Sequence, residues 1–161
     1  PLITSSYTTP NNIINYNVSC ELRSLLEWLY ENSFSIGAFV YCYKENSIDN
    51  KHSFQAEDLQ RVESLCLSLR SELGDCKDFL IHKELLFSKL DNVRVNIRKI
   101  ERLYHGWLQS KSYLESDILI VQISMLNRLS DLLFWLIRKE YKLKKVQESH
   151  WHGYMKPIRF S

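Results

Sequence analysis

Glycine and proline are scarce in this sequence of 161 residues, which holds four glycines and three prolines. Both residue types mark turns, and a fold built from many short strands needs many turns. Their scarcity therefore argues against a loop-rich β fold and favours long helices. A chain of this length predicts one domain with a substantial hydrophobic core.

An excess of charge of one sign is also missing. The chain has 21 Lys and Arg residues against 19 Asp and Glu residues, a formal net charge of +2. Domains that bind nucleic acid usually carry a strongly basic patch or stripe. The balance gives no electrostatic argument for a nucleic-acid partner, and we predict none.

Long apolar runs are lacking as well. No unbroken run approaches the ~18 residues typical of a membrane-spanning helix, and the start of the chain shows no signal-peptide pattern. We therefore expect no membrane association. The expected location is the cytoplasm, or an organelle matrix if the source is eukaryotic.

Metal-ligand spacing is absent among the four cysteines, so we expect reduced thiols rather than a zinc site. They are Cys20, Cys42, Cys66 and Cys76. His150 and His152 form a His-x-His pair, but two ligands without a third at usable spacing are poor evidence for zinc. We predict no metal site in this chain.

Apolar residues recur at alternating steps of three and four in four segments, which is the pattern of amphipathic helices. We predict helices over about 19–43, 55–73, 84–109 and 116–147, packed as a bundle without a sheet. Ser19 can cap the first helix, and Gly74 can stop the second. The domain organisation that follows is an extended N-terminal arm, a helical bundle and a C-terminal tail. These cover residues 1–17, 18–147 and 148–161.

The third predicted helix carries a polar stripe beside its apolar one. At about 100° per residue, Arg94, Arg98 and Glu101 share this stripe, and Arg102 lies at its edge. Guanidinium groups at the border of a buried seam present fixed N–H donors that suit phosphate or carboxylate oxygens. The stripe therefore indicates either an anion site or a set of ion pairs between helices.

The fourth predicted helix has a comparable feature. Ser124, Asn127 and Asp131 fall on one face, and Arg128 can pair with Asp131 three residues later. Asparagine is a mediocre helix former because its amide competes with the backbone. Asn127, among many leucines, therefore either bonds across the bundle or contacts a ligand.

These two stretches resemble the PduO-type ATP:corrinoid adenosyltransferases. That family has an Arg-x-x-x-Arg-Arg-x-Glu-Arg helix followed by an Asn-Arg-Leu-Ser-Asp helix. This chain has the two in the same order, as Arg94, Arg98, Lys99, Glu101 and Arg102 and then Asn127-Arg128-Leu129-Ser130-Asp131. Weaker similarity extends from about residue 19 to residue 141. The resemblance implies an all-α fold, a four- to five-helix bundle that forms a homotrimer with active sites between subunits.

The resemblance also implies an activity. Family members transfer the 5′-deoxyadenosyl group of ATP, bound with Mg²⁺, to a reduced Co(I) corrinoid such as cobalamin and release triphosphate. The corrinoid itself is the nucleophile, and the protein supplies positioning and charge stabilisation. No side chain of this sequence is therefore predicted to be catalytic.

Site roles follow for the positions that match. The resemblance assigns ATP contacts to Arg98, Glu101 and Asn127, with Glu101 orienting Arg98 or contacting the nucleotide. It places Phe79 at the corrinoid pocket and Arg94 in an ion pair between subunits. For Phe79, core packing remains an open alternative. The remaining polar residues are predicted to form structural ion pairs: Lys99, which replaces a family arginine, and Arg102, Arg128 and Asp131.

The chain departs from the family pattern at two places. The family's Gly-rich Thr-Gly-Asp-x-Gly phosphate loop has no counterpart in the printed sequence, and His82-Lys83-Glu84 replace a Pro-Gly-Gly loop. Either the printed chain lacks its natural start or it is a divergent member, so we expect weak ATP binding. Two functions stay open: an active adenosyltransferase, and a non-catalytic relative that forms a helical trimer and binds a corrinoid or a protein partner.

Overall fold

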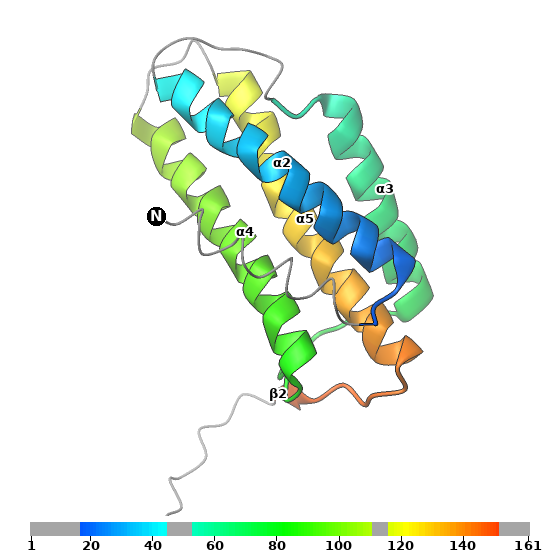
Figure 1. Ribbon diagram of the computed structural model, residues 1–161. Helices are drawn as coiled ribbons and strands as arrows, with labels where there is room; N and C mark the ends of the chain where they lie inside the picture. Colours follow the sequence, from blue (N-terminus) through cyan, green and yellow to red (C-terminus); the bar gives the residue numbers. More distant parts are fainter. Residues whose placement is uncertain (1–16, 45–52, 111–115, 152–161) are drawn as a thin grey trace, which may run out of the picture.

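A computed structural model describes residues 17–44, 53–110 and 116–151. Within these ranges the chain is an all-α bundle (Figure 1). Its helices are α2 (Cys20–Lys44), α3 (Ala56–Leu73), α4 (Leu85–Ser110) and α5 (Ser116–Leu143). The N-terminal arm expected at 1–17 lies outside the described residues except for residue 17, and so does the expected tail from residue 152.

Helix α5 is the centre of the bundle and packs against α4, α3 and α2. In Figure 1 the helices α4 and α3 lie on either side of α5, and α2 crosses in front. Because three helices cover it, α5 buries apolar side chains around much of its circumference. The most deeply buried are Leu119, Met125, Leu126, Leu129, Leu133 and Ile137.

The segment Ile118–Leu143 of α5 is long and apolar enough to cross a membrane, judged by length and composition alone, and half of it is buried inside the bundle. No unbroken apolar run of this length is present, as the sequence indicated, because Asn127, Arg128 and Asp131 interrupt the segment. The central helix of a soluble bundle has the same composition, so this one helix is weak evidence for a membrane.

The predicted apolar stripe of α4 is confirmed, with Leu90, Val93, Ile97 and Tyr104 buried. Helix α3 buries a narrow stripe of Val62, Cys66 and Leu69, whereas Leu65, at apolar spacing from Val62 and Leu69, is 53% exposed. Helix α3 packs on α5 but not on α2. A groove of about 540 Å³ separates α2 from α3, and Leu65 lies in its wall.

Two helix boundaries were predicted from capping residues, Ser19 before α2 and Gly74 after α3, and both are confirmed. The N–H of Leu22 donates to Ser19 Oγ at 3.4 Å, which is an N-cap bond to the third helical residue. Gly74 ends α3 with φ of 75°, and its N–H donates to the Arg70 carbonyl at 2.9 Å. This backbone conformation suits glycine, because glycine has no Cβ.

Helix α5 ends at Leu143, four residues before the predicted end. Lys145 adopts φ of 55°, and the Val146 N–H donates to the Tyr141 carbonyl at 3.0 Å. This is the hydrogen bond of a Schellman motif, which usually has glycine at its left-handed position. The sequence did not reveal the stop because a lysine occupies that position.

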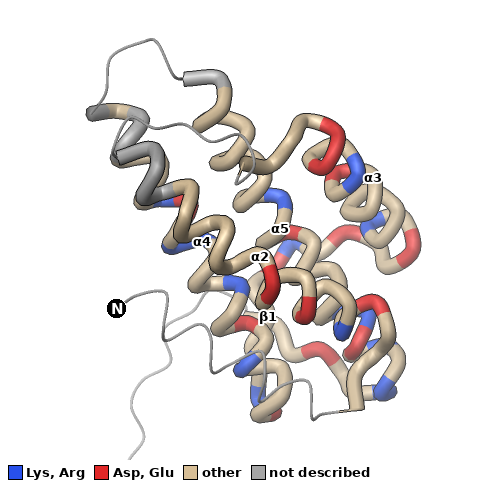
Figure 2. The backbone as a smooth tube through the Cα atoms, turned by 45° about the horizontal axis from the view of Figure 1, so that its top comes forward, with Lys and Arg blue, Asp and Glu red and all other residues tan. Residues whose placement is uncertain are grey.

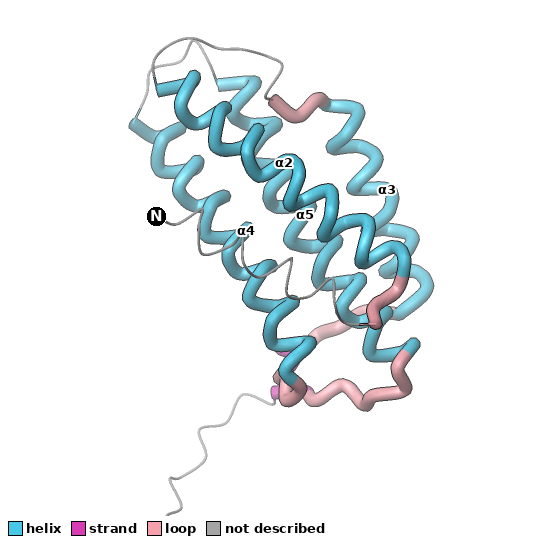
Figure 3. Tube along the Cα trace, viewed as in Figure 1, coloured by secondary structure: helices cyan, strands magenta, loops and turns pink. Residues whose placement is uncertain are grey.

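The prediction of a bundle without any sheet was wrong in one detail. Strand β1 (Phe79–Leu80) pairs antiparallel with β2 (His150–Trp151), with Phe79 opposite Trp151 and Leu80 opposite His150. Helices α3 and α5 end at the same end of the bundle, so the segments that follow them meet there (Figure 3). Two residues per strand are too few to leave a periodic signal in the sequence.

Candidate functional site

Polar side chains of α4 and α5 meet in the seam between the two helices. We call this set the α4–α5 polar cluster: Arg94, Arg98, Glu101, Asn127, Arg128 and Asp131. At its centre lies Glu101, which is only 5% exposed. Its Oε2 lies 2.6 Å from Nη1 of Arg98, and its Oε1 accepts a hydrogen bond of 2.9 Å from Nδ2 of Asn127. Of the two predicted alternatives for Asn127, the structure shows the bond across the bundle.

A buried carboxylate is costly unless charge and hydrogen bonds compensate it. Arg98 supplies the charge for Glu101, and Asn127 supplies a hydrogen bond to one oxygen. The other oxygen, Oε2, accepts no well-directed hydrogen bond from the residues that the structure describes, despite its short distance to Arg98. The charge of Arg98 is therefore the main compensation for this buried oxygen.

Arg128 and Asp131 form the predicted ion pair within α5, with Nη1 and Oδ2 3.0 Å apart. Burial raises the pKa of the Asp131 carboxyl, and the positive charges of Arg128 and Arg98 only partly offset this effect. Charges of the two helices thus act on one another. Lys99 and Arg102 are exposed, and no ion-pair partner is present for them in the described part of the chain, so their structural ion pairs stay a prediction.

Arg94 has a partner within the same chain. Its Nε lies 2.6 Å from Oδ1 of Asp91, and the same carboxylate oxygen lies 3.6 Å from Nε2 of His82. Burial alone would raise the pKa of the Asp91 carboxyl, but the contacts with His82 and Arg94 outweigh burial and lower it to about 2. The sequence analysis missed Asp91, although its spacing of three from Arg94 is a recognisable signal.

A cavity of about 290 Å³ lies beside Arg94, in the N-terminal half of α4. Its lining includes Phe79, His82, Asp91 and Arg94, together with Phe134 of α5. Phe79 is 77% exposed, so it does not pack in the core of this chain. The structure thus brings together the two residues that the resemblance linked to the corrinoid or to a subunit boundary.

Phe134 connects this cavity to the α4–α5 polar cluster. It also lines a second cavity, of about 430 Å³, whose wall includes Arg128, Asp131 and Cys66. Phe79 and Arg94 thus line one cavity, and Arg128 and Asp131 line the second one, which shares Phe134 with it. The predicted ATP residues Arg98, Glu101 and Asn127 line neither cavity. Sequence reasoning did not identify Phe134, because an apolar residue among leucines gives no signal of its own.

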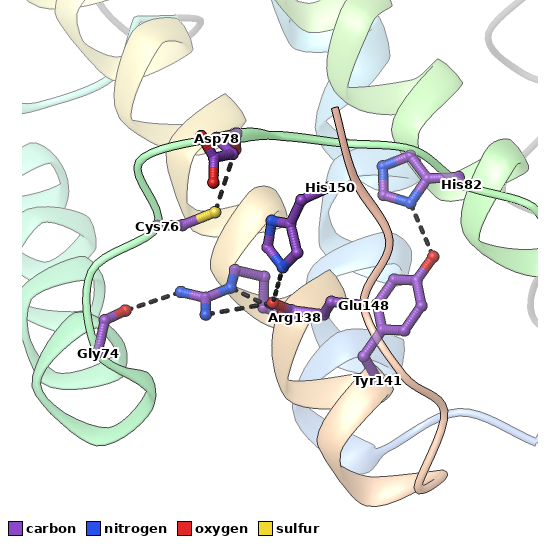
Figure 4. A network of polar contacts seen from close by, with 8 residues as sticks. All are labelled: Gly74, Cys76, Asp78, His82, Arg138, Tyr141, Glu148 and His150. Atoms are coloured by element: carbon purple, nitrogen blue, oxygen red, sulfur yellow. Dashed lines mark hydrogen bonds and ion pairs between the residues drawn. The ribbon is translucent and has the colours of Figure 1, made fainter. Parts of the chain in front are cut away.

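Arg138 ties two chain segments to the lower end of α5 (Figure 4). This buried guanidinium donates from Nη1 to the Gly74 carbonyl at 2.8 Å and from Nε to Glu148 Oε1 at 2.9 Å. His150 reaches the same carboxylate, with 3.5 Å between its Nε2 and Glu148 Oε2. One arginine thus holds both the segment after α3 and the segment after α5.

His82 fixes the other end of the segment that follows α3. Its Nδ1 lies 3.1 Å from the hydroxyl of Tyr141, and its carbonyl accepts a hydrogen bond of 3.0 Å from Ser88 Oγ. The Tyr141 ring stacks on Phe87 at 3.7 Å, and burial raises the pKa of its hydroxyl to about 12. Where the family pattern has Pro-Gly-Gly, this chain therefore has His82, which is held by Tyr141 and Ser88.

Of the four cysteines, Cys20, Cys66 and Cys76 are free thiols, and Cys42 lies among residues whose side chains are not described. Burial raises the pKa of the Cys66 thiol to about 11, so this group stays protonated at neutral pH. Among the described residues, no group of three His, Cys, Asp or Glu side chains could hold a metal ion. His152 lies outside the described residues.

Positive and negative charges are interspersed along α3, and Lys and Arg residues recur along α4 (Figure 2).

The sequence has no match among curated proteins. A family model described as cobalamin adenosyltransferase matches residues 6–140, a stretch that contains α2, α3, α4 and nearly all of α5. Both polar stretches of the α4–α5 polar cluster lie inside it. With most of its length matched, the chain belongs to the cobalamin adenosyltransferase family.

Proposed function

We propose that this protein is an ATP-dependent corrinoid adenosyltransferase of the PduO type. Family membership supports corrinoid adenosyl transfer in general, with ATP and a corrinoid as substrates. The observation that carries the finer proposal is the buried Glu101, which holds Arg98 from its own helix and Asn127 from α5 in one arrangement. Those are the three positions at which the resemblance assigns ATP contacts.

In the proposed reaction, the 5′-deoxyadenosyl group passes from ATP to the reduced Co(I) corrinoid. The bond between C5′ and the triphosphate oxygen breaks, and triphosphate leaves with its electron pair. The bond between C5′ and cobalt forms with the electron pair of Co(I). The chain has to bind both substrates, orient them and stabilise the charge of the leaving triphosphate.

Arg98 is the residue we assign to the triphosphate. Its side chain is 37% exposed, so the guanidinium can reach a phosphate oxygen while Glu101 holds it. A guanidinium forms two parallel hydrogen bonds to phosphate, and a fixed orientation strengthens this contact. Asn127 presents an amide beside it. Mg²⁺ would arrive with ATP and take its ligands mainly from phosphate oxygens and water.

Phe79 and Arg94 are assigned to the corrinoid side of the site. The cavity that they line measures about 290 Å³, which is small for a ligand pocket. It therefore suits one edge of a corrinoid rather than the whole molecule. Arg94 adds hydrogen-bond donors next to the aromatic ring.

A homotrimer with this site near a subunit boundary completes the proposal. Val95 and Leu103 are exposed apolar residues on α4, the helix that carries Arg94, Arg98 and Glu101. Exposed apolar residues that gather on one surface often mark a protein interface. Light scattering at micromolar concentration should give three times the 19.2 kDa of one chain. The proposed location is the cytoplasm or an organelle matrix.

Calorimetric titration with MgATP tests the assignment of the ATP site. We expect Arg98→Ala and Asn127→Ala each to weaken binding about tenfold or more, since hydrogen bonds to charged groups contribute roughly 1.5–3 kcal/mol. Lys142→Ala is the matched control, because Lys142 is an exposed cation at the far end of α5. Equal MgATP affinity in all four proteins would contradict the assignment.

The adenosylation of reduced cobalamin, followed by absorbance and by triphosphate release, separates the two candidate functions. A non-catalytic relative is favoured by one departure from the family pattern: His82-Lys83-Glu84 replace its Pro-Gly-Gly loop. Such a relative would bind cobalamin or a protein without forming adenosylcobalamin. An enzyme would form it at a rate that falls in Arg98→Ala but not in Lys142→Ala.

A further inference from the structure

Arg94 is held by an acidic side chain of its own helix. Its Nε lies 2.6 Å from Oδ1 of Asp91, three residues earlier on α4. The resemblance placed Arg94 in an ion pair between subunits, so a pair within one chain departs from that pattern. In the described part of the chain, no other group accepts a hydrogen bond from the two Nη groups of Arg94. The guanidinium is therefore held through Nε, and its Nη donors are open to a further acceptor.

The carboxylate of Asp91 is itself held from a second direction. The same Oδ1 lies 3.6 Å from Nε2 of His82, which belongs to the connector before α4. The side chain of His82 is 10% exposed, and its Nδ1 lies 3.1 Å from the hydroxyl of Tyr141 on α5 (Figure 4). Tyr141 in turn stacks on the fully buried Phe87. A series of contacts thus runs from the core of the bundle to Arg94.

The electrostatics keep this carboxylate charged. Burial alone would raise the pKa of the Asp91 carboxyl, but the contacts with His82 and Arg94 outweigh burial and lower it to about 2. At neutral pH the ionised carboxylate therefore accepts a charge-assisted hydrogen bond from the guanidinium. The side chains of Asp91 and Arg94 are 26% and 30% exposed, so solvent screens the pair only in part.

Asp91, His82 and Arg94 line the same cavity as Phe79. An edge of a corrinoid that enters this cavity carries amide side chains, whose carbonyl oxygens accept hydrogen bonds. Arginine has a long side chain, and ordering it when a ligand binds costs conformational entropy. A partner that fixes the guanidinium beforehand lowers this cost.

We propose that Asp91 is a positioning residue, which holds Arg94 so that its Nη groups meet a carbonyl oxygen at the edge of the corrinoid. This inference rests on the proposed function. His82 supports the same arrangement from the connector. Because His82 stands where the family pattern has its Pro-Gly-Gly loop, this support belongs to the chain and not to the pattern.

Calorimetric titration with cob(II)alamin tests the proposal. Arg94→Ala removes the guanidinium, Asp91→Asn removes only the charge, and Asp91→Ala removes the carboxylate but keeps a strong helix former. Asp91→Glu keeps a carboxylate at the same helical spacing from Arg94. Glu21→Gln is the control, because Glu21 pairs with Lys139 at 2.8 Å but does not line the cavity. Circular dichroism shows which variants are folded, and two variants without the carboxylate keep the test decisive if one of them does not fold.

We expect Arg94→Ala to raise the Kd for cob(II)alamin about tenfold or more, and Asp91→Asn and Asp91→Ala to raise it about fivefold. Asp91→Glu and Glu21→Gln should change it less than about twofold. Because Asp91 acts through Arg94, Asp91→Ala combined with Arg94→Ala should bind no more weakly than Arg94→Ala alone. The Kd for MgATP, which reports on the other half of the site, should stay constant.

Unchanged cob(II)alamin affinity in both Asp91→Asn and Asp91→Ala would overturn the inference. Additive losses in the double variant would also overturn it, because they would mean that Asp91 affects binding without Arg94. A loss of MgATP affinity with no change for cob(II)alamin would place the acceptor on the nucleotide and not on the corrinoid, which contradicts the proposal.

Comparison with the wild type separates this inference from the function on which it rests. If the wild-type protein does not bind cob(II)alamin, the proposed function fails and the inference fails with it. If the wild type binds and Arg94→Ala weakens binding, while Asp91→Asn and Asp91→Ala bind like the wild type, only the role of Asp91 is wrong.

Discussion

The α4–α5 polar cluster and the lower end of the bundle position their side chains by different means. In the cluster, two long helices are already fixed by apolar packing, and Glu101 only aligns the polar groups that they bring. At the end of the bundle, two short irregular segments have no core of their own. The side chains of Arg138 and Ser88 bind backbone carbonyls there, those of Gly74 and His82. Loss of one polar residue should therefore disturb local charge in the first region and chain geometry in the second.

Arg98→Leu should have the largest effect on stability, because it leaves the buried carboxylate of Glu101 without its positive partner. Removing one member of a buried ion pair costs about 3 kcal/mol or more of unfolding free energy. Urea unfolding measures this loss. Arg102→Leu, at an exposed site one turn along α4, should change the value by less than about 0.5 kcal/mol. If Arg98→Leu with Glu101→Leu is as unstable as Arg98→Leu alone, the explanation is wrong.

Arg138→Ala should lower the free energy of unfolding by about 2–3 kcal/mol, since hydrogen bonds to charged groups are among the stronger ones. Unlike the change at Arg98, it should also release the two segments that form the sheet. Amide hydrogen exchange at Ile81 would then become fast while amides within α4 stay protected. Protection of Ile81 at the wild-type level would show that the segments hold without the arginine. Arg128→Ala, at a more exposed ion pair, should cost less than about 1 kcal/mol.

Asp91 joins the two regions, and its contribution should depend on pH. Its folded-state pKa of about 2 lies below the ordinary value of 3.8. The carboxylate therefore stabilises the fold at pH values above about 4, by about 2 kcal/mol, and this contribution is lost as the pH falls toward 2. Asp91→Asn should be less stable than the wild type at pH 7, and the difference should shrink between pH 4 and pH 2. Urea unfolding across this range measures it.

Asp75→Asn provides the contrast for the pH experiment. Asp75 pairs with Arg70 at 2.6 Å, but both side chains are exposed, so solvent screens the interaction. We expect only a marginal change in stability at any pH. A pH-dependent difference as large as that of Asp91→Asn would mean that the partial burial of Asp91 is not the source of its effect.

Moderate effects, with opposite signs, are expected at two glycines. Gly74→Ala should lower the free energy of unfolding by about 1–2 kcal/mol, because Gly74 has φ of 75°, a conformation that other residues adopt only with strain. Gly106→Ala, inside α4 with open space around it, should raise it by about 0.5–1 kcal/mol. Thermal unfolding would reveal the two shifts, and the same sign for both would contradict this reading.

The helices were predictable because each carries a long apolar periodicity that the packing uses. The triad of Arg98, Glu101 and Asn127 could also be predicted. Helical spacing placed the first two on one stripe, and an asparagine among leucines indicated a hydrogen-bond partner. What spacing could not decide was which partner Asn127 takes. That choice depends on the relative rotation of α4 and α5, which a single sequence does not specify.

The end of the bundle was hardly predictable. Pairing of Phe79 with Trp151 joins residues 72 positions apart through two-residue strands, which leave no periodic pattern. His82 could be noticed only as a replacement for a family loop. Its contacts with Tyr141 and Asp91 join three segments that are separate in the sequence: the connector before α4, α4 itself and α5. Side chains that hold irregular backbone are chosen by tertiary geometry, so their roles appear only once the segments are placed.

The groove between α2 and α3 has a consequence for how the bundle opens. Helix α2 packs on α5 and touches α4 through the rings of Phe39 and Tyr104, but the groove separates it from α3. An element with fewer packed neighbours detaches at a lower free energy than the global unfolding reaction. Amides of α2 should therefore exchange with solvent through a partial opening, ahead of those of α5, which exchange only when the whole bundle unfolds. Transient release of α2 would bare the leucines of α5 that face the groove, and would make α2 the first helix accessible to proteases.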